Sequence, residues 1–372
     1  MKKALCFVLS AAVLLALAPF ASCGSPSDTE TTAAAEDTEE SASSSVTTAE
    51  ETAEIPPEPG AADIGIWYST WYAYTEPGSE NNRYDTWCAW NVEFTPLLPD
   101  GTFGYYDSAD PEVIRFHLEK LSEAQIDFII MDQTNNIDVD SGYINERSLA
   151  VAEQIKAYND TGARPVRYCS AVGGIQWSHD AKTIEDEAEK LWKRYCETEF
   201  GGSGYHYYLD GKPLMIVYGD GAEKAWSEYE GEKTYGEKFT IRWADNGSTP
   251  GYFGWAYSKG AVWNGNVTVV MPGWHNRAGH KPVDRKYGKT YKTFWNTLLE
   301  AEYSPEIIII NSFNEYAERT AVFPALSDDN TAPGDKWYKD RNGTEDPYMF
   351  WDMTVSYIKQ FKEMKKPLYG ER

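Results

Sequence analysis

The sequence has few histidines and cysteines, and they do not form the patterns that bind metals or create nucleophiles. It contains five of each among 372 residues. His275 and His280 lack the spacing of a zinc-binding helix, while Asp138, Asp140 and Gly142 miss the register of a calcium loop by one position. No serine or cysteine occupies a nucleophile-elbow pattern, and no glycine-rich loop leads into a helix to hold a phosphate. We therefore expect no metal and no cofactor.

Positive charge is also scarce. The chain has 58 acidic and 34 basic residues, a net charge of −24. Ten of the acids lie in residues 24–60, and two lysines lie in the first three residues. Without them, 48 acidic and 32 basic residues remain, a net charge of about −16. Such a surface argues against nucleic acid and anionic lipid as partners.

Cysteine usage leaves one question open. Cys88, Cys169 and Cys196 follow the N-terminal region, and this odd number without C-x-x-C spacing indicates neither a disulfide framework nor a zinc ribbon. One bridge among the three is possible, and the sequence does not select the pair.

The N-terminal region is typical of an exported protein. Residues 1–22 combine two lysines, an apolar run and small residues, the layout of a signal peptide. Phe-Ala-Ser before Cys23 resembles a bacterial lipobox, with Phe20 where leucine is usual. That resemblance implies a lipid on Cys23 and a cell-surface location, with a plain secreted form as the alternative. Residues 23–60 are acidic and poor in large apolar side chains, so we expect a disordered tether.

Residues 61–372 predict one domain in which strands and helices alternate. Short runs rich in Ile and Val suit strands covered on both faces, as in a parallel sheet. The predicted strands are 63–71, 126–132, 164–172, 212–220, 237–245, 266–274 and 306–313, and the predicted helices are 110–125, 146–162, 181–200, 287–302 and 346–364. With an eighth strand at 253–258, this pattern favours a (β/α)8 barrel. A doubly wound parallel sheet is the alternative fold, and we expect a monomer.

Acidic and aromatic residues follow the predicted strands, where a barrel builds its site. A sugar ring presents a C–H face that stacks on aromatic rings and hydroxyls that bind carboxylates and amides, so this mixture indicates an oligosaccharide or polysaccharide ligand. The expected substrate-binding residues are Tyr68, Trp71, Asp132, Tyr218, Trp274, Asn314 and Tyr316. Many of the aromatics must also fill the core, because aromatic residues make up 15% of the chain.

Two glutamates three residues apart, Glu315 and Glu318, follow the buried run EIIIINS. Residues three apart share a face on a turn but not along a strand, so we expect the strand to end by about Phe313. Glycoside cleavage needs two carboxyl groups, and neighbouring carboxylates push each other's pKa values apart. Glu315 and Glu318 are therefore the candidate catalytic pair. The alternative is a salt bridge from one of them to an arginine such as Arg319, with the other solvated.

The segment NSFNEYAERTAVFP resembles the N-x-W-N-E-W-x-E-G-T-x-x-x-P signature of family 99 glycoside hydrolases, the endo-α-mannosidases and endo-α-mannanases. IWYSTWY, the D-P-x-x-I/V helix followed by IDFIIMD, and KPLMIVYGD match more loosely, so the resemblance spans most of residues 64–360. It implies a (β/α)8 barrel that cleaves α-linked mannosides with retention. It also implies that Glu315 acts as a base on the sugar's own 2-hydroxyl, and that Glu318 acts as the general acid and later as the base for water.

The chain departs from that signature at four positions. Phe313 and Tyr316 replace tryptophan, Arg319 replaces glycine and Phe323 replaces a common glutamate. Because Arg319 either lies beside Glu318 or points away from it, two hypotheses remain. The first is a glycoside hydrolase acting on α-linked glycans. The second is a surface glycan-binding protein that has lost catalysis on the same fold.

Overall fold

The computed structural model describes residues 62–73, 94–173, 180–245, 251–254, 262–264, 266–275, 283–327, 342, 344–364 and 366–369. All of them belong to one compact unit, Pro57–Arg372. The predicted signal peptide, Cys23, the tether and Cys88 lie outside the described residues.

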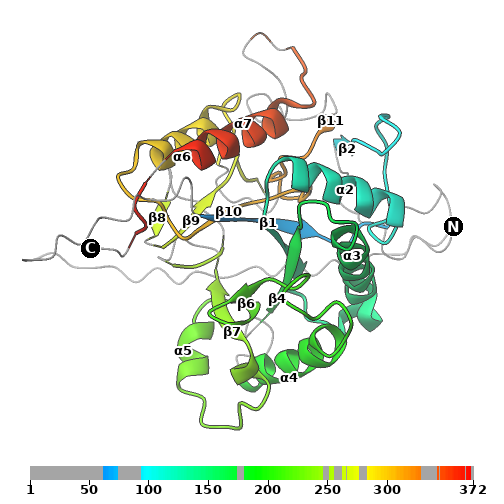
Figure 1. The fold of residues 1–372 in the computed structure, drawn as a ribbon, viewed down its shortest axis with the longest axis vertical. Helices are drawn as coiled ribbons and strands as arrows, with labels where there is room; N and C mark the ends of the chain where they lie inside the picture. Colours follow the sequence, from blue (N-terminus) through cyan, green and yellow to red (C-terminus); the bar gives the residue numbers. More distant parts are fainter. Residues whose placement is uncertain are drawn as a thin grey trace, which may run out of the picture. The chain divides into compact units, whose positions relative to one another are not determined.

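A curled, mainly parallel sheet forms the centre of this unit (Figure 1). Its parallel strands are β1 (Asp63–Ser69), β3 (Phe128–Gln133), β4 (Arg167–Gly173), β6 (Lys212–Tyr218), β7 (Thr240–Ala244), β9 (Val267–Val270) and β10 (Ile307–Ile310). They pair in the order β7-β6-β4-β3-β1-β10-β9, so the first strand lies beside the last, as in a barrel. All seven predicted strands are confirmed.

Four short strands, which the sequence analysis does not predict, pair antiparallel. β5 (Tyr208–Leu209) joins β6, and β8 (Val262–Asn264) joins β9. β2 (Phe94–Pro96) and β11 (Ala325–Ser327) form a separate two-stranded sheet. β5 and β8 thus belong to the sheet that contains the parallel strands, whereas β2 and β11 are separate from it.

The predicted eighth strand lies between β7 and β9 in the chain, and only its first two residues are described. Those residues, Phe253 and Gly254, are not in a strand. The Phe253 N–H donates to the Trp243 carbonyl on β7 at 2.7 Å, and the Phe253 carbonyl accepts from the Trp67 indole of β1 at 2.9 Å. Phe253 therefore bridges β7 and β1 through hydrogen bonds, although it is not part of a strand.

Helices cover the outside of the sheet (Figure 1). They are α2 (Pro111–Glu123), α3 (Tyr143–Asn159), α4 (Lys182–Leu191), α5 (Ala222–Ser227), α6 (Lys289–Glu300) and α7 (Met349–Glu363). α2 begins as its sequence predicts, because Asp110 accepts a hydrogen bond from the Glu112 N–H and Pro111 occupies the first turn. α4 ends earlier than predicted and passes into a π-helical turn, Trp192–Cys196. Among the described residues, no helix has the length and apolarity to cross a membrane.

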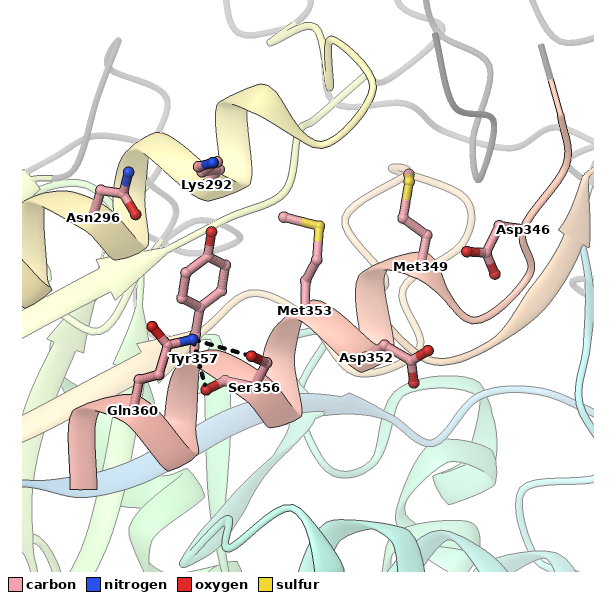
Figure 2. Close-up of a pocket in the computed structure, with 9 residues that line it drawn as sticks. All are labelled: Lys292, Asn296, Asp346, Met349, Asp352, Met353, Ser356, Tyr357 and Gln360. Carbon is pink, nitrogen blue, oxygen red and sulfur yellow. Dashed lines mark hydrogen bonds between the residues drawn. The ribbon is translucent and has the colours of Figure 1, made fainter. Parts of the chain in front are cut away.

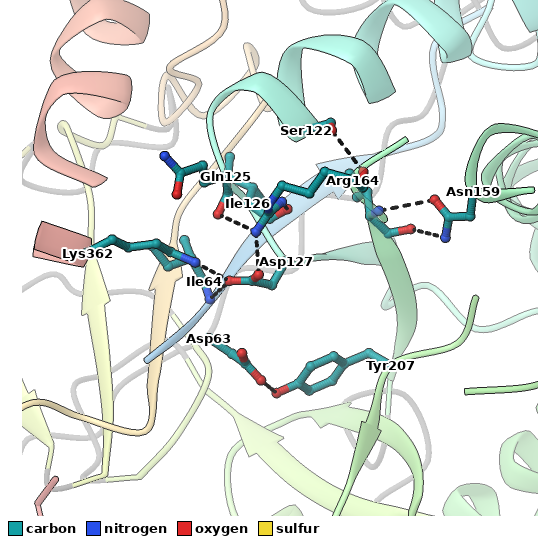
Figure 3. Close-up of polar contacts among 11 residues, drawn as sticks. Asp63, Ile64, Ser122, Gln125, Ile126, Asp127, Asn159, Arg164, Tyr207 and Lys362 are labelled. Atoms are coloured by element: carbon teal, nitrogen blue, oxygen red, sulfur yellow. Dashed lines mark hydrogen bonds and ion pairs between the residues drawn. The ribbon is translucent and has the colours of Figure 1, made fainter. Parts of the chain in front are cut away.

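The N-terminal ends of the strands are joined by a network of charged groups (Figure 3). Asp127, just before β3, accepts from Arg164 at 2.5 Å, from Lys362 of α7 at 2.9 Å and from the Ile64 N–H of β1 at 2.8 Å. This single carboxylate therefore links two strands, a loop and the last helix.

Candidate active site

The two glutamates lie on the turn that follows β10. The strand ends at Ile310, the Asn311–Ser312 peptide is cis, and residues 316–319 form a turn closed by the Arg319 N–H donating to the Tyr316 carbonyl at 3.1 Å. The expectation that the strand stops before Glu315 is confirmed. Both carboxylates therefore follow the C-terminal end of a central strand.

Hydrogen bonds within the segment fix the backbone of Glu315. Its N–H donates to Ser312 Oγ at 2.9 Å, and its carbonyl accepts from the N–H groups of Thr320 and Ala321 at 3.1 and 3.2 Å. Its side chain joins the network as well, because Glu315 Oε1 accepts from the Glu318 N–H at 3.0 Å. The first glutamate thus helps to fold the turn that carries the second.

Asn314 fastens this turn to the end of β1. Its Oδ1 accepts from the Ser69 N–H at 2.7 Å, and its Nδ2 donates to the Ser69 carbonyl at 2.9 Å and to Tyr106 Oη at 2.9 Å. The side chain is fully buried. The predicted substrate-binding residue therefore lies between β1 and the turn, where these contacts position the glutamates.

Burial and neighbouring charge act together on Glu315, which is only 5% exposed. Burial raises the pKa of its carboxyl well above the usual value, and the Glu318 and Asp132 carboxylates raise it further. Backbone N–H groups, including that of Glu318, oppose the shift in pKa. Glu315 therefore has the environment of a carboxyl that exchanges protons above the usual glutamate range.

Asp132 and Tyr218, from β3 and β6, belong to the same cluster. Asp132 is buried, and its burial raises the pKa of the carboxyl, although hydrogen bonds from Thr134 lower it. Burial also raises the pKa of the Tyr218 hydroxyl, with further increases from Glu318, Asp220, Asp132 and Asp245. The structure thus brings four predicted site residues within electrostatic range: Asp132, Tyr218, Glu315 and Glu318.

Glu318 is half-buried and is held from the neighbouring strand. Its Oε2 accepts from the Trp274 indole N–H at 3.1 Å, and its backbone carbonyl accepts from the His275 N–H at 2.9 Å. Trp274 follows β9, so the predicted aromatic residue contacts the second glutamate directly. A half-exposed carboxyl can exchange a proton with a ligand.

The structure places the other aromatic candidates elsewhere. Tyr68 is buried against α2, where its hydroxyl lies 2.8 Å from His117 Nδ1 and its ring stacks on Phe313. Tyr316 is buried and stacks on Phe94 of β2. These two rings pack in the layer around the turn, so their predicted contact with substrate stays a prediction. Trp71 is half-buried just after β1.

The unusual residues of the motif have local explanations. Arg319 has a φ of 56°, in the left-handed region that glycine adopts most easily, which accounts for glycine at this position in the family signature. Phe323 is fully buried, with ring centroids 4.5 Å from Phe313 and 4.9 Å from His117. An apolar side chain therefore suits position 323.

Sequence reasoning did not select several residues that shape the site. Ser312 holds the Glu315 N–H, Tyr106 holds Asn314, and the buried Arg285 donates to the Arg319 and Ala321 carbonyls at 2.7 and 2.9 Å. Ser312 could have been found as a hydroxyl inside the motif. Tyr106 and Arg285 lie in irregular segments without a periodic pattern, so no local signal marks them.

Within the described ranges, no three or more His, Cys, Asp or Glu side chains are placed to hold a metal ion. Cys169 and Cys196 are both free thiols, so the bridge between these two that the sequence left open is not formed. Cys196 Sγ instead lies 3.8 Å from His206 Nδ1.

A groove of about 650 Å³ lies on the outer surface between α6 and α7 (Figure 2). Its walls are formed by Lys292, Asn296, Asp346, Met349, Asp352, Met353, Ser356, Tyr357 and Gln360. None of the sequence-predicted site residues lines this groove. The candidate site is therefore defined by the carboxyl cluster at the strand ends.

A curled parallel sheet with helices outside it and acidic residues at its C-terminal edge is consistent with a (β/α)8 barrel. Among solved structures, the chain is similar to a family 99 endo-α-mannosidase from Bacteroides thetaiotaomicron, in two structures. One, in complex with bis-tris-propane, shares 19% sequence identity with a TM-score of 0.58, and the other shares 17% with a TM-score of 0.54. Each match covers 80% of this chain and 97% of the other.

No protein-family model matches the chain, and no curated protein matches it in sequence. The structural neighbours support the resemblance that the NSFNEYAERT segment first indicated. At this level of identity they establish a shared fold.

Proposed function

We propose that this protein is a retaining glycoside hydrolase that acts on α-linked glycans, with Glu315 and Glu318 as its catalytic residues. The observation that carries the proposal is the carboxyl pair itself, one member buried with a raised pKa and the other half-exposed, on one turn at the strand ends. The family 99 structural neighbours support it. By this proposal the fold is a complete (β/α)8 barrel.

Glu315 acts in this reaction as a base toward the sugar's 2-hydroxyl. It takes the hydroxyl proton while the oxygen attacks the anomeric carbon, and a 1,2-anhydro sugar forms as the glycosidic bond breaks. A raised pKa makes the ionised Glu315 a stronger base than an ordinary glutamate. The reaction therefore runs through the fraction of molecules in which Glu315 is ionised while Glu318 holds the proton.

Glu318 acts as the general acid and donates its proton to the leaving glycosidic oxygen. In the second half it takes a proton from water as the water attacks the anomeric carbon, and Glu315 returns its proton to the 2-oxygen. The Trp274 indole donates to Glu318 Oε2 and thereby orients this carboxyl. Asp132 and Tyr218 contact the sugar beside this pair.

The alternative is a protein that binds glycans without cleaving them. The binding hypothesis requires the Arg319 guanidinium to hold Glu318 away from the substrate. Arg319 Nη1 lies 2.8 Å from His275 Nδ1, and the Glu318 carboxylate accepts from Trp274. Activity of the Glu318 variant separates the two hypotheses.

A product assay tests the proposal. The wild-type domain, residues 61–372, is incubated with α-mannans, α-glucans and N-glycans beside the Glu318→Gln variant. We expect the wild type alone to release sugar from at least one α-linked substrate. If both proteins bind one of the glycans and neither releases sugar from it, the hypothesis of a non-catalytic glycan-binding protein replaces this proposal.

The proposal extends to location. The lipobox resemblance supports a lipid-anchored protein at the bacterial cell surface, attached through Cys23, with residues 24–60 as spacer. We expect the full chain to enter the membrane fraction and Cys23→Ser to abolish this association. A Cys23→Ser protein that stays in the membrane fraction would contradict the anchor.

A further inference from the structure

Arg319 occupies a backbone conformation that is costly for a residue with a side chain. Its φ of 56° lies in the left-handed region, where an L-residue is less stable than glycine. The residue is nevertheless only 5% exposed. Conformations of this kind persist at functional sites where the surrounding contacts hold them in place.

The contact with His275 fixes the chemical state of that imidazole. A guanidinium carries only donors, so His275 Nδ1 must be the acceptor in the 2.8 Å hydrogen bond from Arg319 Nη1. A neutral imidazole that accepts at Nδ1 carries its proton at Nε2. Arg319 therefore selects one tautomer of His275 and one ring orientation.

The segment that contains His275 also holds the second glutamate. Trp274 donates to the Glu318 carboxylate at 3.1 Å, and the His275 N–H donates to the Glu318 carbonyl at 2.9 Å. With the Arg319 bond, three hydrogen bonds join residues 274–275 to residues 318–319. We call this set of contacts the Glu318 clamp.

We propose that Arg319 is a positioning residue for the reaction, acting through His275 to hold the Glu318 carboxyl against the Trp274 indole. This inference rests on the proposed function, because it assigns Glu318 the proton transfer. Arg319 stands where the family signature has glycine, and its side chain stabilises the turn through the hydrogen bond to His275. Arg319 contacts no reacting atom in this account.

Kinetics of four variants test the clamp. We expect Arg319→Gly and His275→Ala each to lower kcat by about 10-fold to 100-fold with KM changed less than about threefold, since a misplaced catalytic group costs rate. Arg319→Lys, which can still donate to His275, should recover part of kcat. The double variant Arg319→Gly/His275→Ala should lose no more than the worse single variant, because both changes break the same link.

Gln125→Gly is the matched control. Gln125 also has a positive φ, 60°, but it follows α2 beside the Asp127 network at the N-terminal ends of the strands (Figure 3). It should keep wild-type kcat. Unchanged kcat in Arg319→Gly, or multiplied losses in the double variant, would overturn the proposal.

Imidazole ¹⁵N NMR gives a readout that does not depend on activity. The chain has five histidines, so a His275→Gln variant assigns the His275 signals. We expect the Nε2–H tautomer of His275 in the wild type and a mixture in Arg319→Gly. If the tautomer changes in this way but the wild type cleaves no glycan, the Arg319–His275 hydrogen bond is supported and the proposed function is refuted. If the wild type is active, and Arg319→Gly has the same NMR spectrum and the same kcat as the wild type, only the Glu318 clamp is refuted.

Discussion

At the N-terminal ends of the strands, Asp127 forms ion pairs with two cations. At the C-terminal ends, Glu315 lies within electrostatic range of two further carboxylates. Asp127 accepts from Arg164, Lys362 and a backbone N–H (Figure 3). Glu315 has its pKa raised by burial and by Glu318 and Asp132. One end pairs its charges, whereas the other keeps like charges together, a costly arrangement that the proposed function would explain.

Removing either of the proposed catalytic carboxylates should have the largest effect. We expect Glu315→Gln and Glu318→Gln each to lower kcat by about 10³-fold, within the range for loss of a general acid or base. Initial rates on the substrate found by the product assay measure this change. Glu123→Gln, on the surface of α2, should keep wild-type activity, and near-wild-type rates in either site variant would remove that glutamate from the mechanism.

Breaking the opposite end should lower stability instead. Asp127→Ala leaves Arg164 and Lys362 without their shared carboxylate, and we expect the free energy of unfolding to fall by about 2 kcal/mol. Urea denaturation gives the value. Lys120→Ala, which breaks the exposed pair with Glu123, should change it by less than about 0.5 kcal/mol. Equal losses in the two variants would mean that the network contributes little.

Buried histidines extend the comparison to acid pH. Burial lowers the pKa of His117 to about 3, whereas the unfolded chain has about 6.5. The neutral ring therefore stabilises the fold above pH 6.5, and this contribution is lost as the pH falls toward 3. Between pH 6 and 4 the unfolding free energy of the wild type should fall as the pH is lowered. We expect this slope to be smaller in His117→Gln by about 1.4 kcal/mol per pH unit. Identical slopes would contradict the neutral state.

The strands were predictable because they are buried on both faces and read as continuous apolar runs, such as IDFIIM and EIIII. α2 was predictable from Asp110 and Pro111. The π-helical turn at Trp192–Cys196 was not, because its helical pattern continues without a break. Phe253 was assigned to a strand, although its backbone hydrogen bonds with Trp243 and Trp67 occur outside one.

The site was predictable only in part. A glutamate pair after a buried strand indicated the turn, and the positions after β3, β6 and β9 supplied Asp132, Tyr218 and Trp274. Tyr68 also lies near a strand end, but the alternation of side chains directs it to His117. Arg319 shows the limit most clearly, because only the three-dimensional contacts reveal that it bonds to His275.

The central claim is that Glu315 is retained for chemistry against a stability cost, and the unfolding free energy of Glu315→Gln tests it most directly. The raised pKa means that this group contributes stability in acid, and that the contribution is lost as pH rises through the folded-state value. The glutamine can still accept from the Glu318 N–H but carries no charge. The account predicts an inactive variant that is more stable than wild type at pH 7, by on the order of 1 kcal/mol, and equally stable at pH 4. A variant that is less stable at pH 7 would contradict it.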